Sequence, residues 1–200
     1  GQGRSAADIP FLEFLIPGLT LMAGMTSSFA NASFSLMFEK IIQCIVDTLM
    51  PPMSAGELTA GYVFASSTRG VLVATMVGLS TQLFVPISIH SWPILIFFAI
   101  AAAIFMSLLG LLTAIWAEKI DHVASVNNFV ILPLVFLSGT FYSIQHLPEE
   151  LQTIAYFNPV FYIIDGFRFG FFGYADSSLK IGIITIVILN LSLWCCLLYT

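Results

Sequence analysis

Residues 126–174 read VNNFVILPLVFLSGTFYSIQHLPEELQTIAYFNPVFYIIDGFRFGFFGY, and this stretch decides the fold class. Its first part, 126–141, is apolar enough to enter hydrocarbon. Pro148 and Asn158-Pro159 then each mark a helix start, because Pro suits the first helical position and Asn is a preferred N-cap. Both helices are too apolar for a soluble loop and too short to cross a bilayer. The stretch therefore predicts a membrane span, followed by two helices over 147–157 and 159–173 that lie in the interface or dip back into it.

Aromatic residues concentrate in the same stretch. Of the 28 Phe, Tyr and Trp residues in the chain, 11 fall within 141–174. Aromatic rings gather where hydrocarbon meets lipid headgroups. An ordinary long loop is the alternative interpretation, and this density of aromatic rings argues against it.

Composition extends the membrane prediction to the whole chain. Charged residues make up 8% of the 200 residues and hydrophobic residues 58%, whereas soluble domains carry about 25% charged residues. We expect one all-α integral membrane domain with five transmembrane helices, over about 14–36, 61–84, 94–117, 124–141 and 180–200. The net charge of −5 is spread thinly with no basic run, which argues against nucleic acid as a partner. The three cysteines lack metal-site spacing, so neither a metal site nor a disulfide framework is expected.

Residues 37–49 predict a helix of another kind. Apolar residues recur there with the helical period while charged and polar residues share the other side, and Pro51-Pro52 closes the segment. The segment is too short and too charged to span a membrane. By itself, this pattern is also typical of a helix that lies on a lipid surface.

Small and polar residues mark one face of the first expected span. Gly24, Ser28, Asn31 and Ser35 are spaced by four, three and four residues, so they share one side of a helix. Such a stripe either lets two helix backbones approach closely or lines a wet path. We favour packing, because Gly and Ser at this spacing are common in helix bundles.

Arg69 lies inside the second expected span. Counted from Glu57, it is about 18 Å along the helix. A charge at that depth costs about 2.5–3.5 kcal/mol on insertion scales, so it should face the bundle interior or a cavity. One hypothesis is that Arg69 attracts an anionic cargo or gates its path. The other is that it pairs with a carboxylate or carbonyl, including one on a helix outside this sequence.

The sequence carries no catalytic motif. It contains no G-x-x-x-x-G-K-[ST] loop, no H-E-x-x-H and no G-x-S-x-G. The chain is therefore not expected to be an enzyme, and any ATP hydrolysis must come from another subunit.

An ordered series of residues resembles the carboxy-terminal half of a known transporter family. The series is Pro133, Phe136-Leu137-Ser138-Gly139, Phe141-Tyr142, Leu147-Pro148, Asn158-Pro159, Tyr162, Gly166-Phe167-Arg168 and Gly170. It is similar to ABC transporter permeases of the export (ABC-2) type, in particular bacterial inner-membrane transport permeases, and the similarity covers the whole chain. The resemblance is specific for the family and leaves the cargo open among lipids, glycans, drugs and other amphipathic molecules.

The resemblance implies partners and a topology. Two copies of the permease pair with two copies of a separate ABC ATPase, which binds ATP and Mg²⁺, while the permease itself holds no cofactor. Residues 37–52 and 118–122 would face the cytoplasm, 86–92 and 142–179 the outside, and a sixth span would precede the first one seen here. Residues 37–49 would be the coupling helix, with an ATPase contact formed by Phe38, Glu39, Lys40, Ile41, Ile42, Gln43, Ile45, Val46, Asp47 and Leu49.

The same reasoning gives candidates for the substrate path or gate. Asn127 and Asn128 either hydrogen-bond across helices, which we favour, or touch cargo. The full set of candidates is Arg69, Asn127, Asn128, Ser138, Gly139, Phe141, Tyr142, Asn158, Pro159, Tyr162 and Arg168. Two other classes of function remain as alternatives, an ion-coupled secondary transporter and a noncatalytic membrane scaffold. The first would require paired half-repeats and buried acids near the midplane, and neither is visible in the sequence.

Overall fold

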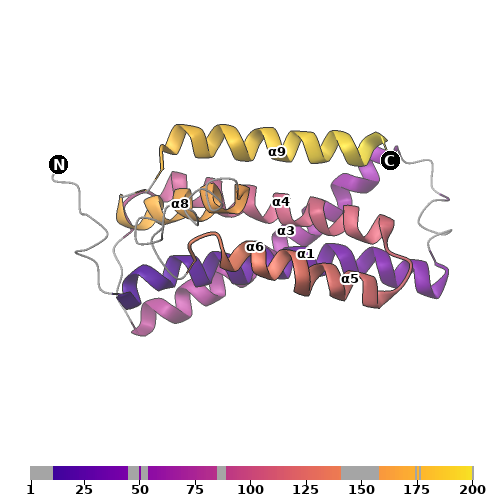
Figure 1. Cartoon of the computed structure of the whole chain (residues 1–200), viewed down its shortest axis with the longest axis horizontal. Coiled ribbons are helices and arrows are strands. Elements are labelled where there is room, and N and C mark those ends of the chain that lie inside the picture. The colour runs from indigo at the N-terminus through magenta and orange to yellow at the C-terminus, as the bar shows by residue number, and fades with distance from the viewer. Residues whose placement is uncertain are drawn as a thin grey trace.

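The computed structural model describes residues 11–44, 50, 54–84, 89–140, 158–173, 175 and 177–199. Within these ranges every regular element is a helix, which confirms the predicted all-α class. The helices follow one long axis and form an elongated bundle (Figure 1). In chain order they are α1 (Phe11–Ile42), α3 (Ala55–Phe84), α4 (Trp92–Trp116), α5 (Ile120–Val126), the π-helix η2 (Asn127–Ile131), α6 (Leu132–Phe136), α8 (Pro159–Phe172) and α9 (Leu179–Tyr199).

The centre of the bundle is α4, which packs against α1, α3, α8 and α9. Phe98, Ala102 and Met106 recur at helical spacing on α4 and are fully buried. They belong to one apolar core that joins α1, α4, α8 and α9. Its buried members are Leu21, Met25, Phe29, Phe98, Ala102, Phe105, Met106, Ile131, Val135, Val160, Ile163, Ile164, Phe167, Phe171 and Ile186.

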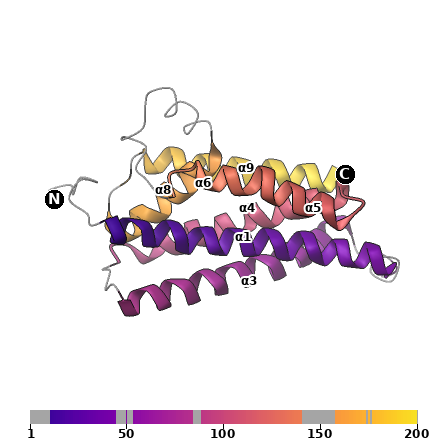
Figure 2. The ribbon, with the colours of Figure 1, turned by 60° about the horizontal axis from the view of Figure 1, so that its bottom comes forward.

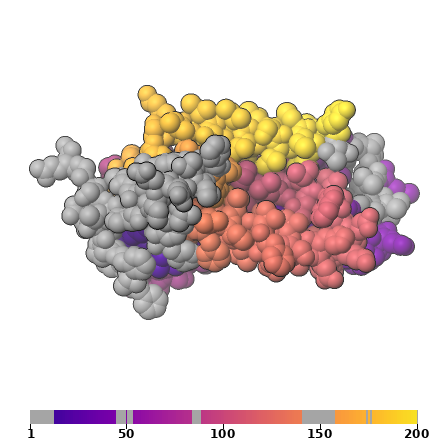
Figure 3. Space-filling view, in the orientation of Figure 1, coloured from indigo at the N-terminus to yellow at the C-terminus, as the bar shows by residue number. Residues whose placement is uncertain are grey.

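The bundle has two distinct ends (Figures 1 and 2). At one end, called here the α8 end, lie the first turns of α1, α4 and α9 and the last turn of α3. At the other, called here the Lys40 end, lie the last turns of α1, α4 and α9 and the first turns of α3 and α5. The strip formed by α5, η2 and α6 covers one face beside α9 (Figure 3), on the opposite side of α1 from α3 (Figure 2).

Three of the described helices are long and apolar enough to cross a membrane. They are Ala55–Leu83, Trp92–Trp116 and Leu179–Tyr199. The predicted first span, which falls within α1, is not among them. The predicted fourth span is a shorter apolar helix, Ile120–Phe136, interrupted by the π-turn η2. The expected count of five spans is therefore not established.

The end of α1 differs from the sequence-based expectation. We expected a separate helix to begin at residue 37, but α1 continues without interruption to Ile42 and ends before Gln43, whose φ is +61°. The apolar residues at 37–42 keep the helical period of the preceding span, so nothing in this part of the sequence ends the helix. At 32 residues, α1 is about 48 Å long, more than a bilayer core requires. The predicted contact residues Ile45, Val46, Asp47 and Leu49 lie outside the described residues.

The helix α8 begins where Asn158-Pro159 predicts a start. The Asn158 side chain accepts a hydrogen bond from the backbone N–H of Val160, and Gly173 ends the helix with φ +70°. Ten of its 14 residues are buried, so α8 dips into the bundle and does not lie flat on its surface. The predicted preceding helix, 147–157, lies outside the described residues.

Candidate functional site: a polar groove between α1 and α3

The tip of α1 is attached to α4 through Lys40. The Lys40 Nζ donates hydrogen bonds to the carbonyl oxygens of Ala114, Ile115 and Ala117, at 2.6, 2.8 and 3.3 Å. These are carbonyls that a helix C-terminus leaves without partners, and a cation there also complements the helix dipole. Burial lowers the pKa of the Lys40 ammonium, and the charge of Glu118 opposes that shift. Lys40 therefore acts as the C-terminal cap of α4.

The same tip is attached to α3 through Glu39. The Tyr62 hydroxyl donates a hydrogen bond to the Glu39 carboxylate. The neighbouring apolar side chains stay largely exposed: Phe38, Ile41 and Ile42 are 52, 48 and 65% exposed. Glu39 and Lys40 thus face the bundle, and an apolar surface of α1 faces outward at the Lys40 end. Sequence periodicity identified the two faces but not which one packs against the bundle.

Polar side chains line a groove between α1 and α3. The Arg69 guanidinium donates to the Asn31 side-chain oxygen at 2.7 Å, and the Asn31 amide donates to the Ser66 hydroxyl at 3.3 Å. Two clefts of about 370 and 350 Å³ meet along Asn31 and Ser35, which line both. The first is lined by Ser27, Ala30, Asn31, Phe34, Ser35, Phe38 and Arg69. The second is lined by Asn31, Ser35, Glu39, Glu57, Leu58, Gly61, Tyr62, Ala65 and Ser66.

A glycine seam closes this groove toward the α8 end. An added Cβ at Gly70 would lie 1.7 Å from the Ser28 hydroxyl and 2.8 Å from the Gly24 carbonyl oxygen. A Cβ at Gly24 would lie 2.9 Å from both the Gly70 carbonyl oxygen and the Ala74 Cβ. The predicted small-residue stripe is therefore divided. Gly24 and Ser28 pack against α3, whereas Asn31 and Ser35 line the open groove.

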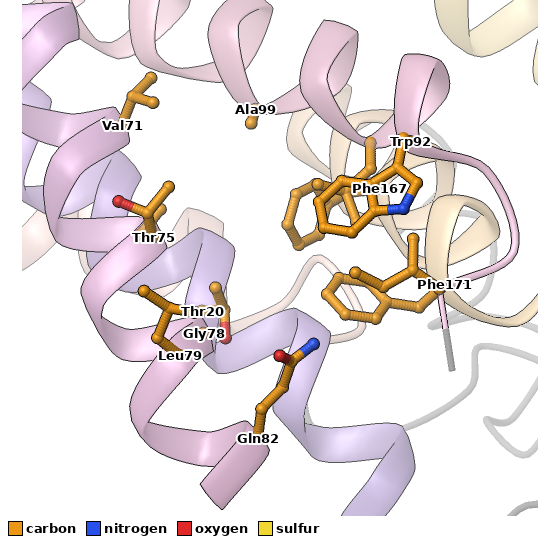
Figure 4. Close-up of a pocket in the computed structure, with 13 residues that line it drawn as sticks. Thr20, Val71, Thr75, Gly78, Leu79, Gln82, Trp92, Ala99, Phe167 and Phe171 are labelled. Carbon is orange, nitrogen blue, oxygen red and sulfur yellow. The ribbon is translucent and has the colours of Figure 1, made fainter. Parts of the chain in front are cut away.

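An apolar pocket of about 190 Å³ lies beyond the seam (Figure 4). It is enclosed by residues of α1, α3, α4 and α8, with Trp92, Phe167 and Phe171 on one side and α3 on the other (Figure 4). The hydroxyl of Thr20 lines it, is buried, and has no hydrogen-bond partner among the described residues. None of the predicted path or gate residues lines this pocket.

The predicted gate residues on α6 and α8 join these two helices. Arg168 is 3% exposed, donates to the Gly139 carbonyl oxygen at 3.0 Å and stacks 3.8 Å above the Phe14 ring centre. The Asn158 amide donates to the Leu134 carbonyl oxygen at 2.6 Å. The Ser138 hydroxyl donates to the Val135 carbonyl oxygen. These contacts fix the end of α6 against α8.

The remaining candidates do not meet in one site. Pro159 and Tyr162 lie on α8, Pro159 at its first position, while Phe141 and Tyr142 lie outside the described residues. Asn127 and Asn128 begin the π-helix, where the Asn127 amide donates to the Asn128 side-chain oxygen at 3.4 Å. That helix is on the opposite side of α1 from α3, the helix that carries Arg69 (Figure 2). No sequence signal indicated a π-helix, a feature found frequently at functional sites.

The described residues contain no group of His, Cys, Asp and Glu that could hold a metal ion. The three described cysteines, Cys44, Cys195 and Cys196, are exposed, and none forms a disulfide with another described residue. The groove offers a guanidinium, the Asn31 amide, several hydroxyls and the carboxylates of Glu39 and Glu57. These side chains can bind a ligand through hydrogen bonds and charge.

Comparison with known proteins identifies the family. The model of the ABC-2 type transporter family matches residues 2–172. The chain is 34% identical over 187 residues to the inner membrane transport permease YadH of Escherichia coli K12, covering 92% of this chain and 73% of YadH. It is 25% identical over 187 residues to nodulation protein J of Rhizobium leguminosarum bv. viciae, covering 90% of this chain and 71% of that protein. The resemblance seen in the sequence is confirmed, and the chain belongs to the ABC-2 type transporter family.

Proposed function

We propose that this chain is the membrane permease subunit of an ATP-driven exporter of the bacterial inner membrane. It moves an amphipathic, lipid, glycan or drug-like cargo outward, with energy from a separate ATPase. Membership of the ABC-2 family and the similarity to a named inner membrane transport permease support this proposal. Three helices able to cross a membrane agree with it.

The observation that carries the proposal is the arrangement at the tip of α1. Phe38, Ile41 and Ile42 present an exposed apolar surface beyond the expected span. An apolar surface at a helix end is typical of a docking site for a protein partner. We assign the ATPase contact to these residues and to the segment that follows them, with two ATPase copies serving two copies of the permease and holding ATP and Mg²⁺.

Glu39 and Lys40 then have a role different from direct docking. Because they hydrogen-bond to α3 and α4, they carry a displacement of the α1 tip into two of the three membrane-crossing helices. The joint between α6 and α8, with Arg168 at its centre, is the outer gate in this proposal. Opening it requires the contact between Arg168 and the Gly139 carbonyl to break.

The test is purification of full-length tagged permease in mild detergent, followed by mass spectrometry of the proteins that accompany it. A near-stoichiometric ATPase with a Walker motif is expected with the wild type. Ile42→Asp should remove it, because a charge in the exposed apolar surface opposes docking while leaving the buried core untouched. Leu198→Asp is the matched control, since Leu198 is an exposed apolar residue at the same end of the bundle, on α9.

Two results would contradict the proposal. One is a folded wild-type permease that purifies without an ATPase from its own cells. The other is an ATPase that stays bound to Ile42→Asp as firmly as to the wild type. The first result would favour the alternative functions, an ion-coupled transporter or a membrane scaffold.

A further inference from the structure

Arg69 has an incompletely satisfied charge in the middle of α3. It is the fifteenth of 30 residues, about 21 Å from the start of the helix. Among the described residues its guanidinium has one partner, the neutral side-chain amide of Asn31, and no carboxylate forms an ion pair with it. A guanidinium carries five N–H donors. Charges at membrane depth pair with an opposite charge or face a wet cavity, so this site calls for an anion.

An anion reaches Arg69 from the open side of the first cleft, because Arg69 is exposed. The polar groove itself extends from Glu39, Glu57 and Tyr62 at the Lys40 end to Arg69, and the two carboxylates line the second cleft and not the first. Beyond Arg69 the two helices touch at the Gly70–Ser28 contact, so the polar groove ends there. The polar groove therefore ends beside Arg69, which is itself an exposed residue.

The surface of α3 changes character at the same point. Leu72 and Met76, three and seven residues after Arg69, lie on its side of the helix and are 56 and 65% exposed. Before Arg69, that side carries Ser66 and Tyr62. A molecule whose anionic group contacts Arg69 would therefore have a polar groove on one side and an exposed apolar track on the other.

We infer that the α1–α3 groove binds the head of an anionic amphiphile. Its oxyanion, a phosphate or carboxylate, contacts the free donors of Arg69 beside the Asn31 amide. Its alkyl chain lies along Leu72 and Met76. A planar guanidinium binds such an oxyanion with two parallel hydrogen bonds. The identification of this amphiphile as cargo rests on the proposed export function, whereas its binding does not.

The test measures binding to full-length permease in a neutral detergent. Dodecyl phosphate is titrated by calorimetry into the wild type, Arg69→Gln and Arg69→Lys. We expect one site per chain, with Kd raised about tenfold or more in Arg69→Gln and less in Arg69→Lys, which keeps the charge but loses the planar fork. Inorganic phosphate, which has no chain, should bind at least about tenfold more weakly than dodecyl phosphate.

Two further variants serve as controls for the effect of Arg69→Gln on binding. Lys180→Gln removes an exposed cation near the α8 end and should leave Kd unchanged. Asn31→Leu places an apolar side chain in the groove and should weaken binding even if Arg69→Gln does not fold. Equal binding by Arg69→Gln and the wild type, or an equal loss in Lys180→Gln, would overturn the inference. An absence of binding to full-length wild type would do the same, because another segment would then neutralise Arg69.

A second arm separates the two sources of such an amphiphile. Native mass spectrometry counts lipids retained from bilayers of phosphatidylcholine with phosphatidylglycerol. Phosphatidylglycerol retained by the wild type and lost in Arg69→Gln identifies a bilayer lipid. Dodecyl phosphate binding without phosphatidylglycerol enrichment supports a cargo head. ATPase co-purification plays no part in either arm, so this inference and the proposed function fail independently.

Discussion

The polar groove and the apolar pocket lie along the same two helices, yet the side chains that line them differ in polarity. The groove has Arg69, Asn31 and Ser35 on its walls, whereas the pocket is lined mostly by aliphatic and aromatic side chains. The seam formed by Gly24, Ser28 and Gly70 lies between them along α1 and α3. One helix pair thus presents a hydrophilic surface to one end of the bundle and a hydrophobic surface to the other. A transporter that must handle both parts of an amphipathic cargo needs this division.

The largest effect should come from breaking the seam that separates the two cavities. Gly70→Ala places a methyl group within 1.7 Å of the Ser28 hydroxyl and 2.8 Å of the Gly24 carbonyl oxygen. The hydroxyl can rotate away but the carbonyl cannot, so α1 and α3 must separate. We expect a loss of about 1–3 kcal/mol in stability, measured as thermal unfolding of the purified permease in detergent.

Gly61→Ala is the matched control for the seam. Gly61 lies in the same helix, and a Cβ there meets no atom within 4 Å. This variant should gain about 0.5–1 kcal/mol, because Ala is favoured over Gly in a helix interior. An equal loss in the two variants would show that the close approach at Gly70 is not the cause.

The next prediction concerns the Thr20 hydroxyl, which lines the apolar pocket and has no hydrogen-bond partner among the described residues. Thr20→Val keeps the shape of the side chain and removes a buried hydroxyl that has no partner among the described residues. Leaving such a group unsatisfied costs about 1–3 kcal/mol, so the substitution should stabilise the protein by about 1 kcal/mol. Ser33→Ala is the comparison, since the Ser33 hydroxyl donates to the Phe29 carbonyl oxygen at 2.7 Å and its removal should bring no gain. A loss of stability in Thr20→Val would mean that a water or a ligand binds this hydroxyl.

The contrast between the cavities also shows what the sequence could predict. Apolar runs predicted α3, α4 and α9 with ends within a few residues, apart from the six residues that precede residue 61 in α3, because long uncharged segments leave few alternatives. The Gly24–Ser35 stripe predicted a specialised face of α1. It could not predict that half of the stripe packs and half stays open, since that depends on Gly70 and Arg69 about 40 residues later in the chain.

The residues of α8 and the α1 tip illustrate the same limit. Aromatic density suggested that α8 lies in the interface or dips back into it, but it did not predict that the Arg168 side chain is buried against Phe14 and Gly139, which are distant in sequence. Periodicity placed Lys40 on the charged face of its helix. Its partners are carbonyls more than 70 residues away, and a local pattern carries no information about them. The structure therefore shows contacts between helix ends that are distant in sequence, which the sequence alone did not predict.

The smallest effect on stability should come from the contact between the α1 tip and α4, at Lys40. Lys40→Met keeps the length of the side chain and removes the three hydrogen bonds that cap α4. Because the group is near the helix end and partly solvated, we expect a loss of about 0.3–1 kcal/mol. Under the proposed function, export should suffer far more than stability, since the α1 tip would no longer move α4, while the ATPase contact proposed at Ile42 stays intact. The measurement is ATPase co-purification beside cargo export in the same cells, with Lys40→Arg as the variant that keeps a donor. Export at the wild-type level in Lys40→Met would show that the cap only stabilises α4, and that the coupling between the two helices runs through Glu39 and Tyr62 or through packing.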